Sequence, residues 1–221
     1  MTVHAPVRPV DAASVLVLDR SSGRTRVLVG RRSTAHVFMP DVYVFPGGRR
    51  DRFDSLVPLT GHLHPAAAEC LMKRTGRRVG DATLRGIAVA ALRELHEEAG
   101  LVVGRNALGA ARLPFRPDLS HLRYFARAIT PPGNVRRYDT RFFAFFADEA
   151  DVDTAAIRDS RELHDLRWID ICHDPGIEMP DITVMVLEEL KKCLQEDASL
   201  PFDRPATFFH TRRGRLVRDI L

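Results

Sequence analysis

The stretch RELHEEAG, residues 93–100, places three carboxylates within five positions. If the stretch is helical, Glu94 lies three residues from Glu97 and four from Glu98, so the three side chains share one face. Like charges at these spacings cost a helix roughly 0.2–0.5 kcal/mol per pair, and the chain gains no structure in return. The pattern therefore predicts either a solvated charged face or a site for a hard cation such as Mg²⁺.

A magnesium site would also indicate phosphate chemistry, because Mg²⁺ keeps several waters and is commonly bridged to substrate phosphates. Arg93 lies four residues before Glu97, so an ion pair along the helix would neutralise part of the cluster and hold its shape. Upstream, the apolar run VYVFPGG at residues 42–48 predicts a strand that ends in two glycines, where another group can approach the backbone closely. Together these features favour the metal site over the solvated face.

The elements that must position these groups are a mixture of strands and helices. Apolar β-branched runs at residues 13–19 and 25–32 flank the turn RSSG and predict a β-hairpin. Asp81 as N-cap and Gly100 as a left-handed end residue predict a helix over 82–99 whose leucines pack while its glutamates point away. Further strands are expected at residues 123–130, 140–147 and 166–171, a helix at 181–196, and one or two edge strands near the end, at 202–221.

A chain of 221 residues fits a single domain with additions, and this order of elements predicts the mixed α/β class. We expect residues 1–11 to form a flexible N-terminus and residues 12–221 to form one domain. Residues 49–81, which mix charge, Gly and Pro around the helical candidate PAAAECLMKR, are interpreted as an inserted loop and helix. Residues 181–221 are interpreted as a C-terminal helical extension.

Composition excludes several classes of protein. Hydrophobic residues make up 45% of the chain and charged residues 28%, which is typical of a globular protein and not of a disordered, collagen-like or coiled-coil chain. The formal charge of +4 is compatible with phosphate-bearing substrates without requiring nucleic acid. Three cysteines without CxxC spacing fit a reducing cytoplasm, and we expect neither a signal peptide nor a membrane span.

The run RELHEEAGL, residues 93–101, resembles the second half of the Nudix box: Arg-Glu, an aliphatic, any residue, Glu-Glu, any residue, Gly and an aliphatic. Its resemblance to Nudix hydrolases implies an α/β/α sandwich with a mixed β-sheet. It also implies hydrolysis of a diphosphate linked to another moiety, with Mg²⁺ or Mn²⁺ as cofactor and a small nucleoside diphosphate derivative as partner. A homodimer is the expectation at the level of the family.

The resemblance assigns roles to particular residues. It makes Glu94, Glu97 and Glu98 the cation ligands, Arg93 the arginine that orients a glutamate, and Gly48 the glycine that opens the site and adds a carbonyl ligand. A general base is also needed, and the sequence leaves two candidates: Glu98, or a carboxylate brought in by a loop. Glu162 in SRELHDLRW is the loop candidate, and a surface charge is an equally good interpretation of it.

The sequence departs from the full Nudix box in its first half. The positions of the leading glycine and the early glutamate are occupied by Val79 and Arg85, and the early glutamate has no obvious replacement. Gly48 lies far upstream of Arg93, so an insertion separates the glycine strand from the helix. We expect the 49–81 insertion to form a lid or pocket wall that selects the substrate.

Three outer motifs, FMPDVYVFPGGRRD, YDTRFFAFFA and RPATFFHTRRGR, resemble the branch of the family that includes peroxisomal coenzyme A diphosphatase. The resemblance makes coenzyme A or acyl-coenzyme A a candidate substrate. ADP-ribose, a nucleotide sugar and a nucleotide-binding module with little activity are the alternatives, while the modest charge argues against a nucleic-acid substrate. Arg32, Arg50 and Arg141 are expected to hold phosphate oxygens through paired hydrogen bonds, although each also fits a plain surface charge.

Overall fold

The computed structural model describes residues 7–33, 40–76, 79–107, 112–173 and 175–221. Within these residues the strands are β1 (Val10–Asp19), β2 (Arg26–Arg32), β3 (Tyr43–Val44), β4 (Gly47–Arg49), β5 (Gly104–Asn106), β6 (Phe115–Pro117), β7 (Arg123–Ile129), β8 (Tyr138–Phe146), β9 (Leu163–Asp170), β10 (Thr207–Arg212) and β11 (Arg215–Ile220). The helices are α1 (Pro65–Met72), α2 (Asp81–Ala99) and α3 (Asp181–Glu196), with short 3₁₀ helices η1 (Arg52–Leu56) and η2 (Thr154–Ala156). In these residues no helix is both long and apolar enough to cross a bilayer.

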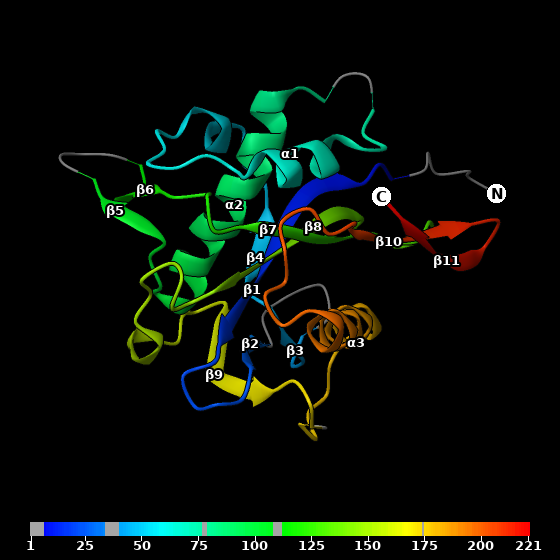
Figure 1. Ribbon diagram of the computed structural model, residues 1–221. Helices are drawn as coiled ribbons and strands as arrows, with labels where there is room; N and C mark the ends of the chain where they lie inside the picture. The colour runs from blue at the N-terminus through cyan, green and yellow to red at the C-terminus, as the bar shows by residue number, and fades with distance from the viewer. Residues whose placement is uncertain (1–6, 34–39, 77–78, 108–111, 174) are drawn as a thin grey trace.

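A mixed sheet lies between two helical layers (Figure 1). Its order is β11-β10-β7-β8-β1-β2-β3, with β4 paired to β1 and β9 paired to β2. β1 and β8 run parallel over nine registered pairs, from Val10 with Tyr138 to Leu18 with Phe146. β5 and β6 form a separate two-stranded ribbon.

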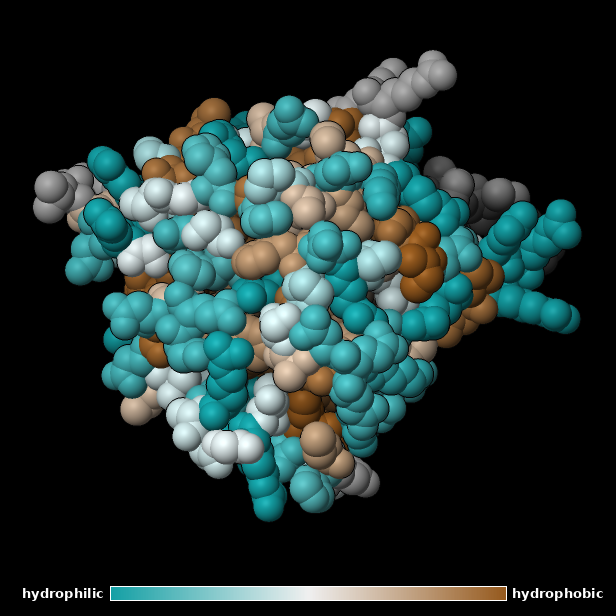
Figure 2. Space-filling model, in the orientation of Figure 1, coloured by the Kyte–Doolittle hydropathy of each residue, from teal (hydrophilic) through white to brown (hydrophobic). Residues whose placement is uncertain are grey.

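Side chains along β1 point alternately to the two faces of the sheet, and each face is covered by a helical layer. Val15 and Val17 point into a core shared with α1 and α2, while Leu16 and Leu18 point into a second core that includes α3. The four side chains are fully buried, because both faces of the sheet are covered. The predicted α/β/α sandwich is therefore confirmed. Figure 2 shows that the outer face in this view is mainly hydrophilic, with apolar side chains in small separate areas.

Helix α2 matches the predicted span closely. Its N-cap is Gly80 and not Asp81, so the predicted cap is wrong by one residue. Asp81 instead lies in the first turn, where a carboxylate still favours the helix dipole. At the other end Gly100 has φ 75°, which confirms the predicted left-handed end. The buried face includes Leu84, Leu92 and Leu95, as the periodicity predicts.

The predicted strand at residues 42–48 is two short strands. β3 pairs with β2 and β4 pairs with β1, and Pro46 lies at the break between them. Proline has no N–H to donate, but its carbonyl accepts from Val15 N at 2.9 Å and from Ser14 Oγ at 3.0 Å. This change of partner places β4 along β1, next to α2.

The segments 49–81 and 181–221, which were interpreted as an insertion and an extension, both pack into the domain. In the 49–81 segment η1 packs against α2, and α1 buries Ala67, Cys70 and Leu71 in the core on the α2 side. The extension 181–221 is not wholly helical, because after α3 the strands β10 and β11 form a hairpin and β10 pairs in parallel with β7. β1 begins at Val10, inside the N-terminal segment 1–11, of which residues 1–6 lie outside the described residues.

Candidate active site

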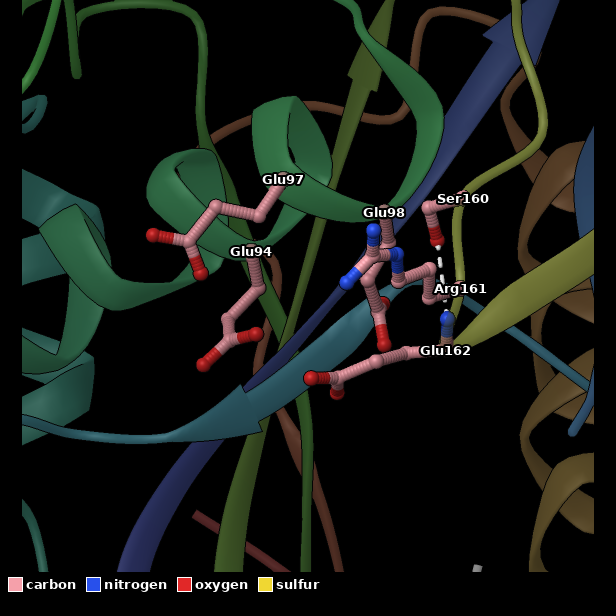
Figure 3. Close-up of a pocket in the computed structure, with 6 residues that line it drawn as sticks. All are labelled: Glu94, Glu97, Glu98, Ser160, Arg161 and Glu162. Atoms are coloured by element: carbon pink, nitrogen blue, oxygen red, sulfur yellow. Dashed lines mark hydrogen bonds between the residues drawn. The ribbon is translucent and has the colours of Figure 1, made fainter. Parts of the chain in front are cut away.

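Four carboxylates from two distant parts of the chain line one pocket (Figure 3). Three come from α2, and Glu162 comes from the segment just before β9; Ser160 and Arg161 complete the lining. The pocket has a volume of about 240 Å³. Figure 3 shows Glu94 and Glu98 descending side by side from the helix and Glu162 reaching toward them, with the carboxylate of Glu97 turned to one side. The structure thus brings the loop carboxylate to the helix cluster.

Ser160 holds the turn that delivers Glu162. Its hydroxyl oxygen accepts hydrogen bonds from the backbone N–H of Glu162 at 3.3 Å and of Leu163 at 3.0 Å. The side chain of Glu162 is exposed, so it reaches the pocket from the solvent side. The sequence analysis did not identify Ser160, although a serine two residues before a candidate carboxylate is a typical turn signal.

The double glycine lets β4 pass directly beneath the glutamates. Gly47 N donates to Glu98 Oε2 at 2.7 Å. A Cβ atom placed on Gly48 would lie 2.3 Å from Glu94 Oε1, well inside contact distance. Glycine is therefore needed at position 48 for close approach, since any side chain there would displace the carboxylate of Glu94.

Gly48→Ala is expected to weaken cation binding at least several-fold while leaving the fold intact, because the added methyl group pushes Glu94 away and that carboxylate ends a flexible side chain. Titration with Mn²⁺ and thermal unfolding measure the two effects. Gly76→Ala is the matched control, since a Cβ atom there meets no atom of the described residues within 4 Å. Equal Mn²⁺ affinity in the two variants would contradict the role of Gly48.

Arg93 connects the pocket to the segment that precedes it. Its Nη1 donates to Glu94 Oε1 at 2.8 Å and to Glu97 Oε2 at 2.9 Å, as the spacing predicts for Glu97. Its Nε donates to Asp54 Oδ1 at 2.9 Å, and its Nη2 to Asp54 Oδ2 at 3.2 Å and to the Arg49 carbonyl at 2.9 Å. Five hydrogen bonds thus fix one guanidinium in the site.

Asp54 gives Arg93 a carboxylate partner that was not predicted from the sequence. It lies in η1, is 2% exposed, and makes a paired contact with Arg93 from 39 residues upstream. Asp51 and Asp54 form a capping box, in which Asp51 accepts from Phe53 N and Asp54 accepts from Asp51 N. The run DRFD at residues 51–54, shortly after the glycines, was the available signal for this turn, although it does not show that Arg93 is the partner.

Burial changes the acid–base properties of the cluster. It raises the pKa of Glu98 to about 8, opposed by the hydrogen bond from Gly47 N–H and reinforced by the negative charge of Glu94. Burial also raises the pKa of Glu94, although the neighbouring Arg93 opposes the shift. Burial alone would lower the pKa of Arg93, but the hydrogen bond to Asp54 and the charge of Glu94 outweigh it and raise the value. Glu98 is therefore largely protonated at pH 7.

The donor set fits a hard divalent cation. In the described residues no three acidic, histidine or cysteine side chains are arranged to hold a metal ion as they stand. The reason is visible in their contacts, because Glu94 and Glu97 are bonded to Arg93 and Glu98 to Gly47 N. Glutamate oxygens are the ligand type that Mg²⁺ and Mn²⁺ prefer, and binding of an ion here would require these carboxylates to leave their present partners.

Of the three arginines predicted to hold phosphate, two line a cavity that the glutamates also line, and one of these, Arg50, has its Nε 3.7 Å from Asp11 Oδ2. Arg32 and Arg50 line a larger cavity, of about 1730 Å³, which also receives the four glutamates. Arg141 does not line it and is 1% exposed, with Nη1 donating to Asp11 Oδ1 at 2.9 Å and to the Asp139 carbonyl at 2.8 Å. This buried ion pair argues against the predicted phosphate contact of Arg141.

Comparisons with known proteins relate the fold to one group. No family model and no curated protein matches the chain. A Nudix hydrolase from Alicyclobacillus acidocaldarius superimposes with a TM-score of 0.62 at 23% identity, over 89% of this chain and 97% of that one. The Nudix domain of Shewanella oneidensis NrtR, complexed with ADP ribose, gives 0.52 at 12% identity over 85% and 90%. A MutT/nudix family protein from Enterococcus faecalis gives 0.52 at 11% identity over 92% and 68%.

Sequence identities this low show a shared fold but do not show a shared reaction. The shared features are the mixed sheet between helical layers and the coverage of most of each chain. By its three-dimensional structure, the chain has the fold of the Nudix hydrolases.

Proposed function

We propose that the protein is a Mg²⁺- or Mn²⁺-dependent diphosphatase that hydrolyses the diphosphate linkage of a nucleoside diphosphate conjugate. The observation that carries the proposal is the gathering of four carboxylates in one pocket under a double-glycine strand. Carboxylates this close together repel one another in the absence of a cation, and Arg93 bonds only two of the four. A cation bridged to phosphate oxygens would neutralise the carboxylates and explain why they are gathered in one pocket.

Each residue of the site has a separate role in this proposal. Glu94, Glu97 and Glu98, with the Gly48 carbonyl, would hold the cations, and Arg93 sets the orientation of two of the three carboxylates. Bound cations offset the charge that develops on phosphate oxygens and make nearby water more acidic. Arg32 and Arg50 line the adjoining cavity, where guanidinium groups can hold phosphate oxygens. Water attacks phosphorus, a new P–O bond forms, and the bond to the bridging oxygen breaks.

The general base is either Glu98 or Glu162. A base must be ionised to accept a proton, and burial keeps Glu98 mostly neutral at pH 7 when no cation is bound. The same proton must leave before Glu98 can bind a cation, so its raised pKa does not separate the two roles; Glu162 is exposed and reaches the same pocket, which keeps it as the second candidate for the base.

Two substrate classes are in view. The outer sequence motifs favour coenzyme A or acyl-coenzyme A, whereas the likeness to a domain complexed with ADP ribose favours ADP-ribose or a nucleotide sugar. A binding module with little activity was the alternative that the missing early glutamate favoured. Asp54 weakens that alternative, because it gives Arg93 a buried carboxylate partner.

Incubation with Mg²⁺ or Mn²⁺ and a panel of coenzyme A, acyl-coenzyme A, ADP-ribose, NADH and a dinucleoside polyphosphate tests the proposal. Product masses identify both the substrate and the bond that is cleaved. Tight binding of a panel compound without cleavage would replace the enzyme by a binding module. Lack of both binding and cleavage across the panel would contradict the assigned substrate class.

Cation affinity is expected to increase with pH. Glu98 has a pKa of about 8 and must lose its proton to bind a cation, so binding below pH 8 releases up to one proton. Apparent Mn²⁺ affinity should rise about tenfold per pH unit from pH 6 toward pH 8 and level off above it. Calorimetric titration in two buffers of different ionisation enthalpy counts the protons. A flat affinity over this range would contradict the burial of a neutral Glu98.

A further inference from the structure

Two arginines and a phenylalanine form a cationic surface on the wall of the large cavity. The Cζ atom of Arg112 lies 3.5 Å from the centroid of the Phe53 ring, and that of Arg52 lies 4.7 Å from it. All three line the cavity that also receives Glu94 and Glu98. We call Arg52, Phe53 and Arg112 the arginine–phenylalanine cluster.

The cluster is fixed to the catalytic helix through η1. Asp51 accepts a hydrogen bond from Phe53 N at 2.8 Å and donates its own N–H to Asp54 Oδ2 at 2.7 Å. Asp54 in turn makes the paired contact with Arg93 of α2. Phe53 directly precedes Asp54 in the chain. The position of its ring is therefore fixed by the same short helix that positions Arg93.

The guanidinium groups of the cluster differ from those of three less exposed arginines. Arg93, Arg127 and Arg141 each bond carboxylates. Each guanidinium lies over the Phe53 ring, and within the described part of the chain neither makes a hydrogen bond or has a carboxylate within 4.0 Å. A ring that packs against a guanidinium face leaves the N–H groups at its edge available to an anion.

We propose that the arginine–phenylalanine cluster is a binding site for a phosphate group of the nucleotide ligand, and that it works without a divalent cation. The site lies in the same cavity as the carboxylates but draws on different residues, so it holds phosphate oxygens other than those that the cations take. The inference rests on the proposed function for the identity of the ligand, and its binding test does not depend on turnover.

Binding of ADP in EDTA at low ionic strength tests the site directly. Arg52→Gln and Arg112→Gln are each expected to weaken ADP binding roughly tenfold, the size of one lost charge-assisted hydrogen bond. Phe53→Leu keeps an apolar side chain but removes the ring face, and a several-fold loss is expected. Adenosine, which has no phosphate, should bind the unaltered protein and both arginine variants equally.

Arg105→Gln is the matched control, because Arg105 is an exposed arginine of β5 that does not line the cavity. Thermal unfolding of every variant guards against loss of the fold. Undetectable ADP binding by the unaltered protein in EDTA, or equal binding by Arg52→Gln, Arg112→Gln and the control, would overturn the site. Turnover of Glu97→Gln tests the diphosphatase separately, so failure of one idea leaves the other standing.

Discussion

Glu97→Gln and Glu98→Gln are each expected to lower turnover on the order of 10²–10⁴-fold without unfolding the chain. Each replacement removes a negative charge from the cation site and keeps the size of the side chain. At position 98 a glutamine oxygen still accepts the Gly47 N–H, and because Glu98 is buried and largely neutral at pH 7, a neutral amide fits the same place. The fold should therefore tolerate the change better than catalysis does.

Steady-state kinetics with the substrate found by mass analysis, together with Mn²⁺ titration, measures the loss. Glu188→Gln is the matched control, since Glu188 is an exposed glutamate on α3 that does not line the cavity. A loss confined to kcat with unchanged Mn²⁺ affinity would make the residue a base and not a ligand. Turnover equal to that of the control in both variants would refute the assigned site.

The helix cluster was predictable because its geometry is local. Spacings of three and four residues place Glu94, Glu97 and Glu98 on one face of any helix, and Gly100 marks its end. The same reasoning gave residues 181–196 as a helix, which is the span of α3. Both helices carry a strong apolar stripe, so the period of the sequence is sufficient to define them.

Contacts between distant segments were not predictable in this way. The partner of Arg93 lies 39 residues upstream, and no local pattern connects the two residues. Arg141 was assigned to phosphate because a strand pattern does not show which arginine ends in a buried ion pair; in the fold it pairs with Asp11, 130 residues away. The split of the 42–48 strand likewise depends on pairing with β1 and β2, which tertiary structure decides.

Asp54→Ala is expected to have the largest effect on stability, about 3–5 kcal/mol in the free energy of unfolding. The side chain of Asp54 is 3% exposed and that of Arg93 is 15% exposed, so the change leaves a largely buried cation without its paired acceptor. Asp54 also accepts Asp51 N–H in the cap of η1, and this bond is lost with it. Turnover should fall as well, because Arg93 orients Glu94 and Glu97.

A double-mutant cycle separates the ion pair from the cap. Arg93→Met removes the cation that Asp54→Ala leaves without its most buried partner. The free energy of unfolding of the double variant should therefore fall by about 1–3 kcal/mol less than the sum of the two single losses. Urea unfolding at pH 7 measures each corner. Asp153→Ala serves as the control, since Asp153 caps η2 by accepting Ala155 N–H and makes no ion pair within the described residues. Strict additivity would mean that Asp54 only caps η1 and that the glutamates alone hold Arg93. A positive coupling would make the 49–81 segment part of the active site, because Asp54 would then fix the arginine on which two cation ligands depend.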